Sequence, residues 1–378
     1  MKIGIVTLPF NWNYGGILQT YALQLALKDL GHEPVTINRD TVLTSFKLKV
    51  LLIIRRSILR VIGKKVIVRP WPTKTEEKII RQHTDKFISE NISTTHLLKS
   101  EAGFANLANY GFEAFITGSD QVWRPKYSPV LENHFLGFLD KKSKVKRIAY
   151  AASFGVDNWE FSEKQTVSCR ELAGLFNAIS VREDSGINLC EKYLNVKAKQ
   201  VLDPTMLISK EKYVELVEKE NLVPFSGKLF NYVLDITPEK SKFIENVAER
   251  LGLVSFSSTA KSFRDLGRKR LNECIFPPVT KWIRGFMDAE FVITDSFHGT
   301  VFSIIFNKNF IAVGNATRGM TRFTSLLKTF GLEERLILEI NDRALQIADS
   351  PIDFKKVNEI LETEKVKSIA FLKNALTV

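Results

Sequence analysis

The chain of 378 residues is long enough to form two domains with buried cores. Its hydrophobic fraction of 44% and charged fraction of 25% are ordinary for a soluble globular protein. The three cysteines form no CxxC pair or metal-ligand cluster, which excludes a disulfide framework and fits reduced thiols in a cytosolic protein. No run of about 18 apolar residues is present, and the β-branched amino terminus lacks the form of a signal peptide.

The first elements of the chain predict the opening unit of a Rossmann-like domain. A buried strand over 2–8 is followed by a loop that ends in Gly15 and Gly16, and apolar spacing then predicts a helix over 17–30. The loop lacks the GxGxxG spacing, so dinucleotide binding is only weakly indicated. Its two glycines either let a phosphate or a sugar approach the backbone, or serve only the tight turn.

The segment 41–75 supplies most of the positive charge of the chain. It contains nine basic residues and no acidic one, against a net charge of +12 for the whole chain. On a helical wheel one side is basic, with Lys49, Arg56, Arg60 and Lys64, and the other is apolar, with Leu51, Ile54, Ile58, Val61 and Ile62. Such a helix either lies on an anionic membrane surface, meets a polyanionic substrate, or is an insertion packed on the core with a solvated basic face. No nucleic-acid-binding motif accompanies the charge, so we expect no nucleic acid partner.

Four later segments repeat one design, a buried strand that ends in small or polar residues. They are 114–120, 147–155, 178–185 and 201–205. Because helices alternate with these strands, we expect a parallel sheet. Asp120, Ser153 and Arg182 would then lie along one rim at the carboxyl ends of the strands, where ligands bind in open α/β sheets.

The pattern of strands and helices restarts near residue 209. It predicts helices over 210–220, 239–250 and 279–288, and strands over 229–235, 253–257, 291–294 and 310–313. We therefore expect an α/β fold with two Rossmann-like domains, over residues 1–208 and 209–345. A final helical segment, 346–378, is expected to pack back on the body.

His298 follows the strand 291–294 and precedes an apolar helix over 301–306. At the amino end of that helix, the backbone N–H groups of Gly299 and Thr300 can face a bound anion. His298 is either a site residue that acts as acid or base near neutral pH, or a packing residue at a tight turn. Asp295 is either a group that deprotonates or orients a substrate, or the N-cap of the following helix.

Several stretches together resemble the polysaccharide pyruvyl transferase family. They are NYGGILQTYAL from Asn13, GSDQVW from Gly118, VREDS from Val181, DPT from Asp203 and TDSFHG from Thr294, and they follow one another in family order. The resemblance covers residues 3–330 and implies two Rossmann-like domains facing across a cleft, as in GT-B glycosyltransferases. It also implies transfer of a pyruvyl group from phosphoenolpyruvate to two sugar hydroxyls of a surface polysaccharide or its precursor, which forms a pyruvate ketal.

Taken with the chemistry of that reaction, the resemblance predicts three groups of site residues. The catalytic group is His298, Asp120 and Asp295. The donor-binding group is Arg182, Ser296, Gly299, Thr300, Arg318 and Arg322. The acceptor-binding group is Asn13, Gly15, Gly16, Gln19, Trp123 and Ser153.

The chain departs from the family pattern at one point. Members of the family have Arg-x-His where this chain has Ser296-Phe297-His298, so a cation expected to hold the donor is missing there. Arg318 or Arg322, just after the next strand, is in position to supply it from another direction. The acidic residues are not spaced as metal ligands, so we expect no metal and no cofactor besides phosphoenolpyruvate as co-substrate.

Two other functions fit the same sequence features. One is a GT-B glycosyltransferase that uses a nucleotide sugar, and the other is a non-catalytic sugar-binding relative. For the pyruvyl transferase, we expect a saccharide or lipid-linked saccharide acceptor. The expected location is the cytoplasm, and a basic segment that binds membrane would place the protein on the inner face of the cell membrane.

Overall fold

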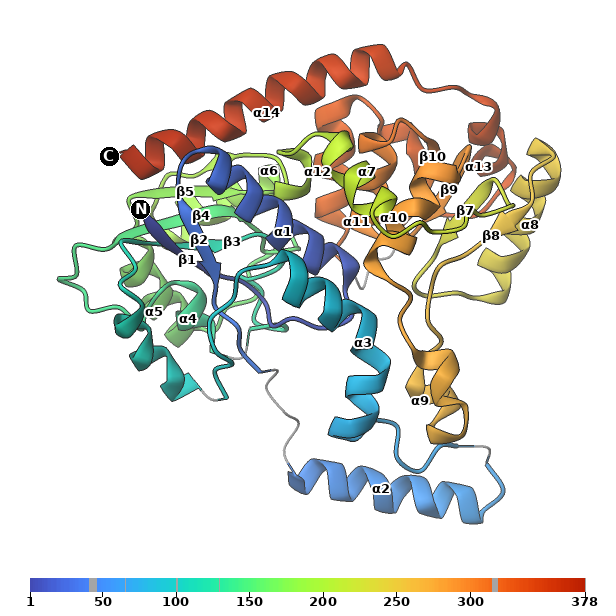
Figure 1. Ribbon diagram of the computed structural model, residues 1–378, viewed down its shortest axis with the longest axis horizontal. Helices are drawn as coiled ribbons and strands as arrows, with labels where there is room; N and C mark the ends of the chain where they lie inside the picture. Colours follow the sequence, from blue (N-terminus) through green and yellow to red (C-terminus); the bar gives the residue numbers. More distant parts are fainter. Residues whose placement is uncertain (41–45, 65, 100, 129, 315–318, 378) are drawn as a thin grey trace.

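Two parallel sheets form the frame of the protein, whose computed structural model describes residues 1–40, 46–64, 66–99, 101–128, 130–314 and 319–377 (Figure 1). The first sheet has the strand order β2-β1-β3-β4-β5-β6 and the second β11-β10-β9-β7-β8. The strands of the first are β1 (Lys2–Val6), β2 (Glu33–Thr36), β3 (Ala114–Gly118), β4 (Lys146–Ala152), β5 (Ala178–Val181) and β6 (Lys199–Gln200). Those of the second are β7 (Leu229–Tyr232), β8 (Ser255–Phe256), β9 (Phe291–Thr294), β10 (Asn309–Val313) and β11 (Leu336–Ile337).

Helices alternate with the strands and cover both faces of the first sheet. They are α1 (Tyr14–Asp29), α2 (Phe46–Val61), α3 (Lys74–Asn91), η1 (Glu101–Tyr110), α4 (Leu131–His134), α5 (Glu163–Ala173), α6 (Asp184–Leu189), η2 (Cys190–Leu194) and η3 (Pro204–Met206). Capping boxes define where α3 and α5 begin, because Thr73 and Ser162 exchange hydrogen bonds with the residues three positions on, Glu76 and Gln165.

The second sheet carries its own helices. They are α7 (Lys210–Glu218), α8 (Pro238–Leu251), α9 (Phe263–Leu266), η4 (Arg268–Cys274), α10 (Val279–Asp288), α11 (Phe297–Ile305), α12 (Met320–Phe330), η6 (Glu333–Arg335), α13 (Asp342–Gln346), η7 (Ile347–Asp349) and α14 (Phe354–Thr377). Helix α14 runs along the top of the molecule, from the second domain back to the first (Figure 1). There the Ser368 hydroxyl accepts a hydrogen bond from the Leu202 N–H at 3.0 Å.

One hydrophobic core runs through both domains. It includes Ile5 and Leu18 from the first and Trp282 and Phe302 from the second, all at most 1% exposed. Tyr14 joins the two halves, since its ring lies 5.5 Å from that of Trp282 and its hydroxyl donates to the Pro277 carbonyl at 2.7 Å. The carboxyl ends of the two sheets are therefore held close to each other by packing.

Three boundaries near the site differ from those predicted by the sequence. Helix α11, predicted over 301–306, begins at Phe297, so His298, Gly299 and Thr300 lie in its first turn. Helix α1 begins at Tyr14 instead of Ile17, so Gly15 and Gly16 lie in its first turn and not in a loop. Burial of Tyr14 outweighs the poor helix propensity of the two glycines. The strand predicted over 201–205 is wrong: β6 ends at Gln200, and the Asp203 carboxylate accepts the Thr205 N–H at 3.0 Å to begin η3.

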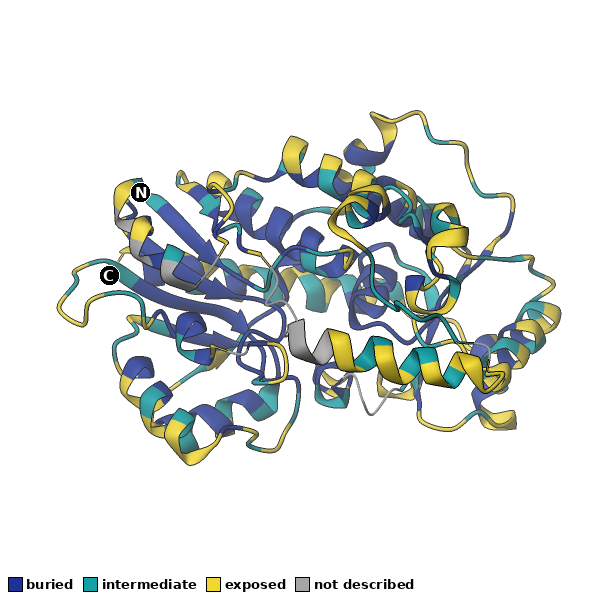
Figure 2. Cartoon of the chain, turned by 90° about the horizontal axis from the view of Figure 1, so that it is seen from below, coloured by how far each residue is buried: buried dark blue, intermediate teal, exposed yellow. Residues whose placement is uncertain are grey.

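Helix α2 stands apart from the rest of the first domain, at the lower end of the molecule (Figure 1). Viewed from below, most of its surface is exposed or half-buried (Figure 2). The interpretation of this helix as an insertion packed on the core is wrong, because Ile54 and Ile58 are more than half exposed. Among the helices that the structure describes, none is both long and apolar enough to cross a membrane.

Candidate active site

Polar residues from both sheets converge where their strands end. Asp120 follows β3, Arg182 follows β5, Asp203 follows β6, and His298 follows β9. The backbone of Asp120 adopts a left-handed conformation with φ of 59°, which a non-glycine residue adopts only at some cost. Strained residues of this kind are common at functional sites. The rim predicted from the sequence thus exists, and the second domain adds a histidine to it.

Arg182 lies at the centre of a buried ion-pair network. Its Nη1 donates to Asp203 Oδ2 at 2.7 Å, its Nη2 lies 3.7 Å from Asp120 Oδ1, and its Nε lies 3.8 Å from Glu183 Oε1. The three carboxylates outweigh the effect of burial and raise the pKa of Arg182. Within the described part of the chain, Nε and Nη2 of Arg182 have no hydrogen-bond acceptor.

His298 approaches the same network from the second domain. Its Nε2 lies 3.6 Å from Asp203 Oδ2, which is too far for a hydrogen bond, and no described residue offers this nitrogen a hydrogen-bond partner. Burial disfavours the charge of Asp203, but His298, Arg182 and the Thr205 N–H together lower its pKa well below the usual range. Asp203 therefore stays ionised and links Arg182 to His298.

Gly15 leaves free the space that the His298 ring occupies. A Cβ atom at Gly15 would lie 2.0 Å from Nδ1 of His298, far inside van der Waals contact. The imidazole ring therefore rests directly on the first turn of α1, at a position that tolerates no side chain. This contact explains one of the two glycines of the opening motif. Gly16 faces only the Asn13 side chain, with 3.3 Å to its Nδ2.

Arg322 supplies a second buried guanidinium to the site. The ring of Phe297 lies 4.4 Å from Cζ of Arg182 and 5.4 Å from Cζ of Arg322. Nη1 of Arg322 also lies 3.8 Å from Asp120 Oδ1. Burial, together with the positive charge of Arg182, lowers the pKa of Arg322 to about 10. Arg322 thus brings a cation to the neighbourhood of Ser296-Phe297-His298, where the sequence lacks the arginine of the family pattern.

Ser153 and Glu183 complete the rim. The Ser153 hydroxyl donates to the Glu183 carboxylate, and burial raises the pKa of Glu183 against the opposing effects of Arg182 and this hydrogen bond. The Ser153 N–H donates to the Asp120 carbonyl at 3.1 Å. Ser153 therefore positions Asp120 and Glu183.

The amino end of α11 is capped by its own chain. The Ser296 hydroxyl accepts the Gly299 N–H at 3.3 Å, and the Ser296 carbonyl accepts the Thr300 N–H at 3.0 Å. The prediction that these two N–H groups are free for an anion is therefore wrong, because Ser296 engages both. The N-cap is Ser296 and not Asp295.

Asp295 points away from the network. Its carboxylate accepts the N–H groups of Leu234 at 2.6 Å and Asp235 at 3.1 Å, and pairs with Lys240 Nζ at 2.7 Å. These contacts hold the loop between β7 and α8. The structure does not bring Asp295 together with His298 and Arg182.

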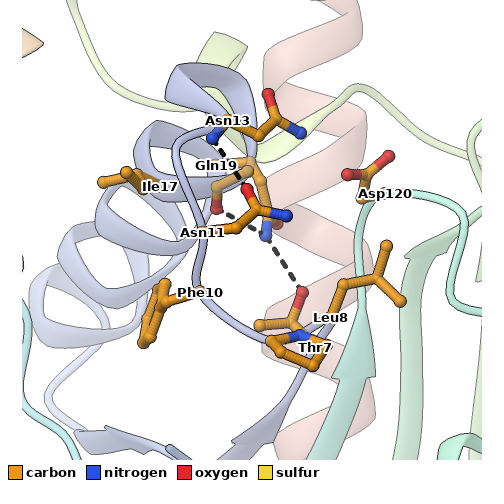
Figure 3. A pocket seen from close by; sticks show the side chains of 10 residues that line it. Thr7, Leu8, Phe10, Asn11, Asn13, Ile17, Gln19 and Asp120 are labelled. Atoms are coloured by element: carbon orange, nitrogen blue, oxygen red, sulfur yellow. Dashed lines mark hydrogen bonds between the residues drawn. The ribbon is translucent and has the colours of Figure 1, made fainter. Parts of the chain in front are cut away.

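The predicted acceptor residues divide into two sets. Asn13, Gly16 and Gln19 line a small pocket whose far wall is Asp120 (Figure 3). Gln19 is fixed there by donating to the Thr7 hydroxyl at 3.1 Å, and its Oε1 has no partner among the described residues. Trp123, in contrast, is fully buried, and its ring stacks on Phe135 with 4.6 Å between centroids.

Sequence reasoning missed three residues of the network. Asp203, Glu183 and Phe297 stood inside the quoted motifs but were not assigned to the site. A signal for Asp203 was the pair Asp203-Pro204 directly after the buried residues Val201 and Leu202, on the same rim as Arg182. Arg318 lies outside the described residues.

Two parallel α/β domains whose carboxyl edges meet at a buried polar network define a GT-B-like protein. Arabidopsis thaliana UGT89C1 complexed with UDP has a similar fold, with 9% identity, a TM-score of 0.52 and 100% of both chains covered. A glycosyltransferase from Rickettsia africae ESF-5 aligns with 12% identity and a TM-score of 0.47 over 98% of this chain and 93% of its own. No curated protein matches the sequence. The polysaccharide pyruvyl transferase family model matches residues 13–317, and the chain belongs to this family.

Proposed function

We propose that this protein transfers a pyruvyl group from phosphoenolpyruvate to two hydroxyls of a sugar in a surface polysaccharide or its precursor. Family membership supports the class of reaction. One structural observation supports the donor: Nε and Nη2 of Arg182 and Nε2 of His298 are buried without hydrogen-bond partners among the described residues. Buried polar nitrogens left unpaired cost free energy, so such a group indicates a ligand that pairs with them.

The donor fits the charges around these nitrogens. Phosphoenolpyruvate offers a carboxylate and a phosphate, and a guanidinium binds either group through two parallel hydrogen bonds. Arg182 and Arg322 lie on the same Phe297 ring, so one donor molecule would contact both. Asp120 contacts both guanidiniums only at 3.7–3.8 Å, which leaves room for the donor to compete for them.

The reaction needs one proton delivered and two removed. The donor's methylene carbon takes a proton, and the first sugar hydroxyl loses its own as its oxygen bonds to the central carbon. The second hydroxyl then displaces phosphate and loses its proton. We assign His298 as the acid that protonates the donor, a role worth roughly 10²–10⁴ in rate. We assign Asp120, which lies 3.7 Å from Arg182 and lines the pocket at Gln19, as the base that takes the hydroxyl proton.

The acceptor would enter from the pocket beside α1. Asn13 is exposed and Gln19 carries a buried carbonyl oxygen without a partner among the described residues, so both offer hydrogen bonds to sugar hydroxyls. In this proposal the positive charge comes from the two arginines, and phosphoenolpyruvate is the sole co-substrate. Asp295 and Trp123 have no role in it, because one holds the β7–α8 loop and the other the core.

The proposal is tested by phosphate release from phosphoenolpyruvate. Purified protein is incubated with a panel of free, nucleotide-linked and lipid-linked galactosides, glucosides and mannosides. Phosphate is expected only when a suitable sugar is present, and Arg182→Ala and His298→Ala should each slow its release by about 10²-fold or more. Binding of a nucleotide sugar without binding of phosphoenolpyruvate would instead identify a glycosyltransferase. Sugar binding with no turnover of either donor, unchanged by both substitutions, would identify a non-catalytic protein.

A further inference from the structure

Helix α2 presents an apolar stripe to solvent. Leu51 is 62% exposed, Ile54 52%, Ile58 57%, Val61 86% and Ile62 63%. Their spacing of three or four residues places them on one side of the helix. Exposed apolar side chains that are contiguous in this way indicate an interaction surface, whereas isolated ones do not.

Basic residues border the stripe. Arg55, Arg60 and Lys64 are exposed, while Arg56 is half-buried and donates to the Ile67 carbonyl at 2.5 Å. The sequence from 41 to 75 contains no acidic residue to neutralise them. The surface of α2 therefore combines an apolar face with a positive margin.

The fold adds a second basic segment beside this helix. Arg264, Arg268, Lys269 and Arg270 are exposed on α9 and η4, which belong to the second domain. These two short helices lie next to the end of α2 (Figure 1). A Cβ atom at Gly267 would lie 3.1 Å from the Ile67 side chain, so the chain leaving α2 packs on the start of η4.

Contacts with α3 hold this second segment in place. The Phe276 N–H donates to the Ile80 carbonyl at 3.0 Å, and Ile80, Phe263 and Cys274 share a small buried cluster. Arg69, after α2, pairs with Glu76 of α3 at 2.6 Å. Residues about 200 positions apart in sequence thus form one end of the molecule with an excess of positive charge, since segment 263–274 has four basic residues against Asp265 and Glu273.

We propose that α2 and the adjacent segment 263–274 dock on an anionic phospholipid bilayer, with α2 lying in the plane of the interface. An amphipathic helix with apolar and basic sides binds such a surface through apolar burial and attraction to anionic headgroups. A second copy of this chain is a poor occupant, because pairing α2 with itself would bring two positively charged segments together. A lipid surface instead supplies both the apolar layer and the opposite charge. This inference does not depend on the proposed reaction.

Flotation with vesicles tests the proposal on the full chain. Binding is expected to vesicles of equimolar phosphatidylcholine and phosphatidylglycerol, to weaken in high salt, and to be far weaker with phosphatidylcholine alone. Arg55→Gln, Arg60→Gln and Lys64→Gln together should lower the partition coefficient about 100-fold, from about fivefold per charge. Leu51→Asn, Ile54→Asn and Ile58→Asn together should lower it at least about tenfold.

Two matched variants control for net charge and surface polarity. Lys355, Lys356 and Lys373 are exposed on α14, at the opposite end of the molecule, and their change to Gln should leave binding within about twofold. Val167→Asn, Val223→Asn and Leu338→Asn replace apolar residues elsewhere that are even more exposed than Leu51, Ile54 and Ile58. Unchanged circular dichroism confirms that each variant is folded.

Several results would overturn the proposal. Wild-type protein that stays unbound with anionic vesicles would do so, as would equal losses in the α2 variants and their controls. Equal binding to neutral and anionic vesicles would contradict the role of charge. A different result would show that α2 instead binds a second copy. In that case the wild type would sediment as a dimer without lipid, and the variant with Leu51→Asn, Ile54→Asn and Ile58→Asn would sediment as a monomer.

Discussion

Replacing Gly15 by Ala tests how His298 is positioned. The new methyl group would lie 2.0 Å from Nδ1 of His298, so the ring must move by more than about 1 Å to regain normal contact. A misplacement of this size costs about 10²-fold in rate, or roughly 2.7 kcal/mol of transition-state stabilisation. The substitution should not weaken α1, because Ala is the better helix former by about 1 kcal/mol.

The assay is phosphate release from phosphoenolpyruvate, together with thermal unfolding. Gly174→Ala is the matched control, since a Cβ atom there would meet nothing closer than the Glu171 carbonyl oxygen at 3.5 Å, and it should keep its activity within about threefold. If Gly15→Ala acts through His298, the double variant with His298→Ala should be no slower than His298→Ala alone. Full activity of Gly15→Ala, or additive losses in the double variant, would refute the reasoning.

Three further substitutions test other parts of the site. Arg322→Ala should lower kcat/KM for phosphoenolpyruvate about 10²-fold, and Arg322→Lys should restore little of it because an ammonium lacks the planar, two-pronged geometry; unchanged kinetics would remove Arg322 from the donor site. The depressed pKa of Asp203 means that its charge stabilises the fold above the ordinary value of 3.8, and that this stability is lost as pH falls below it. Urea unfolding of Asp203→Asn should therefore show lower stability at neutral pH and a smaller loss between pH 5 and about pH 3 than wild type; parallel curves would contradict the assignment. Asp295→Asn should lower stability by about 3 kcal/mol through the buried pair with Lys240 while the folded protein keeps its turnover, whereas a large fall in kcat at unchanged stability would make Asp295 catalytic.

The sequence predicted the parallel sheets well because their strands are buried on both faces. The runs at 114–120 and 291–294 each begin with three apolar residues and end in small or polar ones, a pattern with few alternative structures. The sequence failed at Tyr14, where a tertiary contact decides, and at Asp203, where a local side-chain cap decides. Burial of Tyr14 against Trp282 extends α1 through two glycines, and a side-chain cap at Asp203 replaces the last expected strand by a 3₁₀ turn.

The candidate site could be predicted in part. His298, Arg182 and Asp120 each follow a strand. The rule that residues after parallel strands lie at the carboxyl edge of the sheet therefore placed them correctly on the rim. The rule assigns a residue to an edge but does not say which way its side chain points. Asp295, one residue after β9, turns to the β7–α8 loop, and Trp123 turns into the core. The neighbouring position of Arg322 depends on how the two domains pack, which local sequence patterns do not contain.

The structure also separates two interpretations of the basic segment. A helical wheel gave the same amphipathic pattern for a helix packed on the core and for one at a membrane surface. Only the fold shows that the apolar side faces solvent and that a second basic segment from the other domain lies beside it. Burial, and not periodicity, rules out the helix packed on the core, and docking on a membrane is our proposal for the exposed face.

The most direct test of the proposed function is a calorimetric titration with phosphoenolpyruvate, followed by a crystal structure of the complex. We predict binding that Arg182→Ala and Arg322→Ala each weaken strongly, with the donor's carboxylate and phosphate in hydrogen-bond contact with these two guanidiniums and its methylene carbon facing His298. Absence of binding, or a donor bound away from Arg182 and His298, would contradict the proposal.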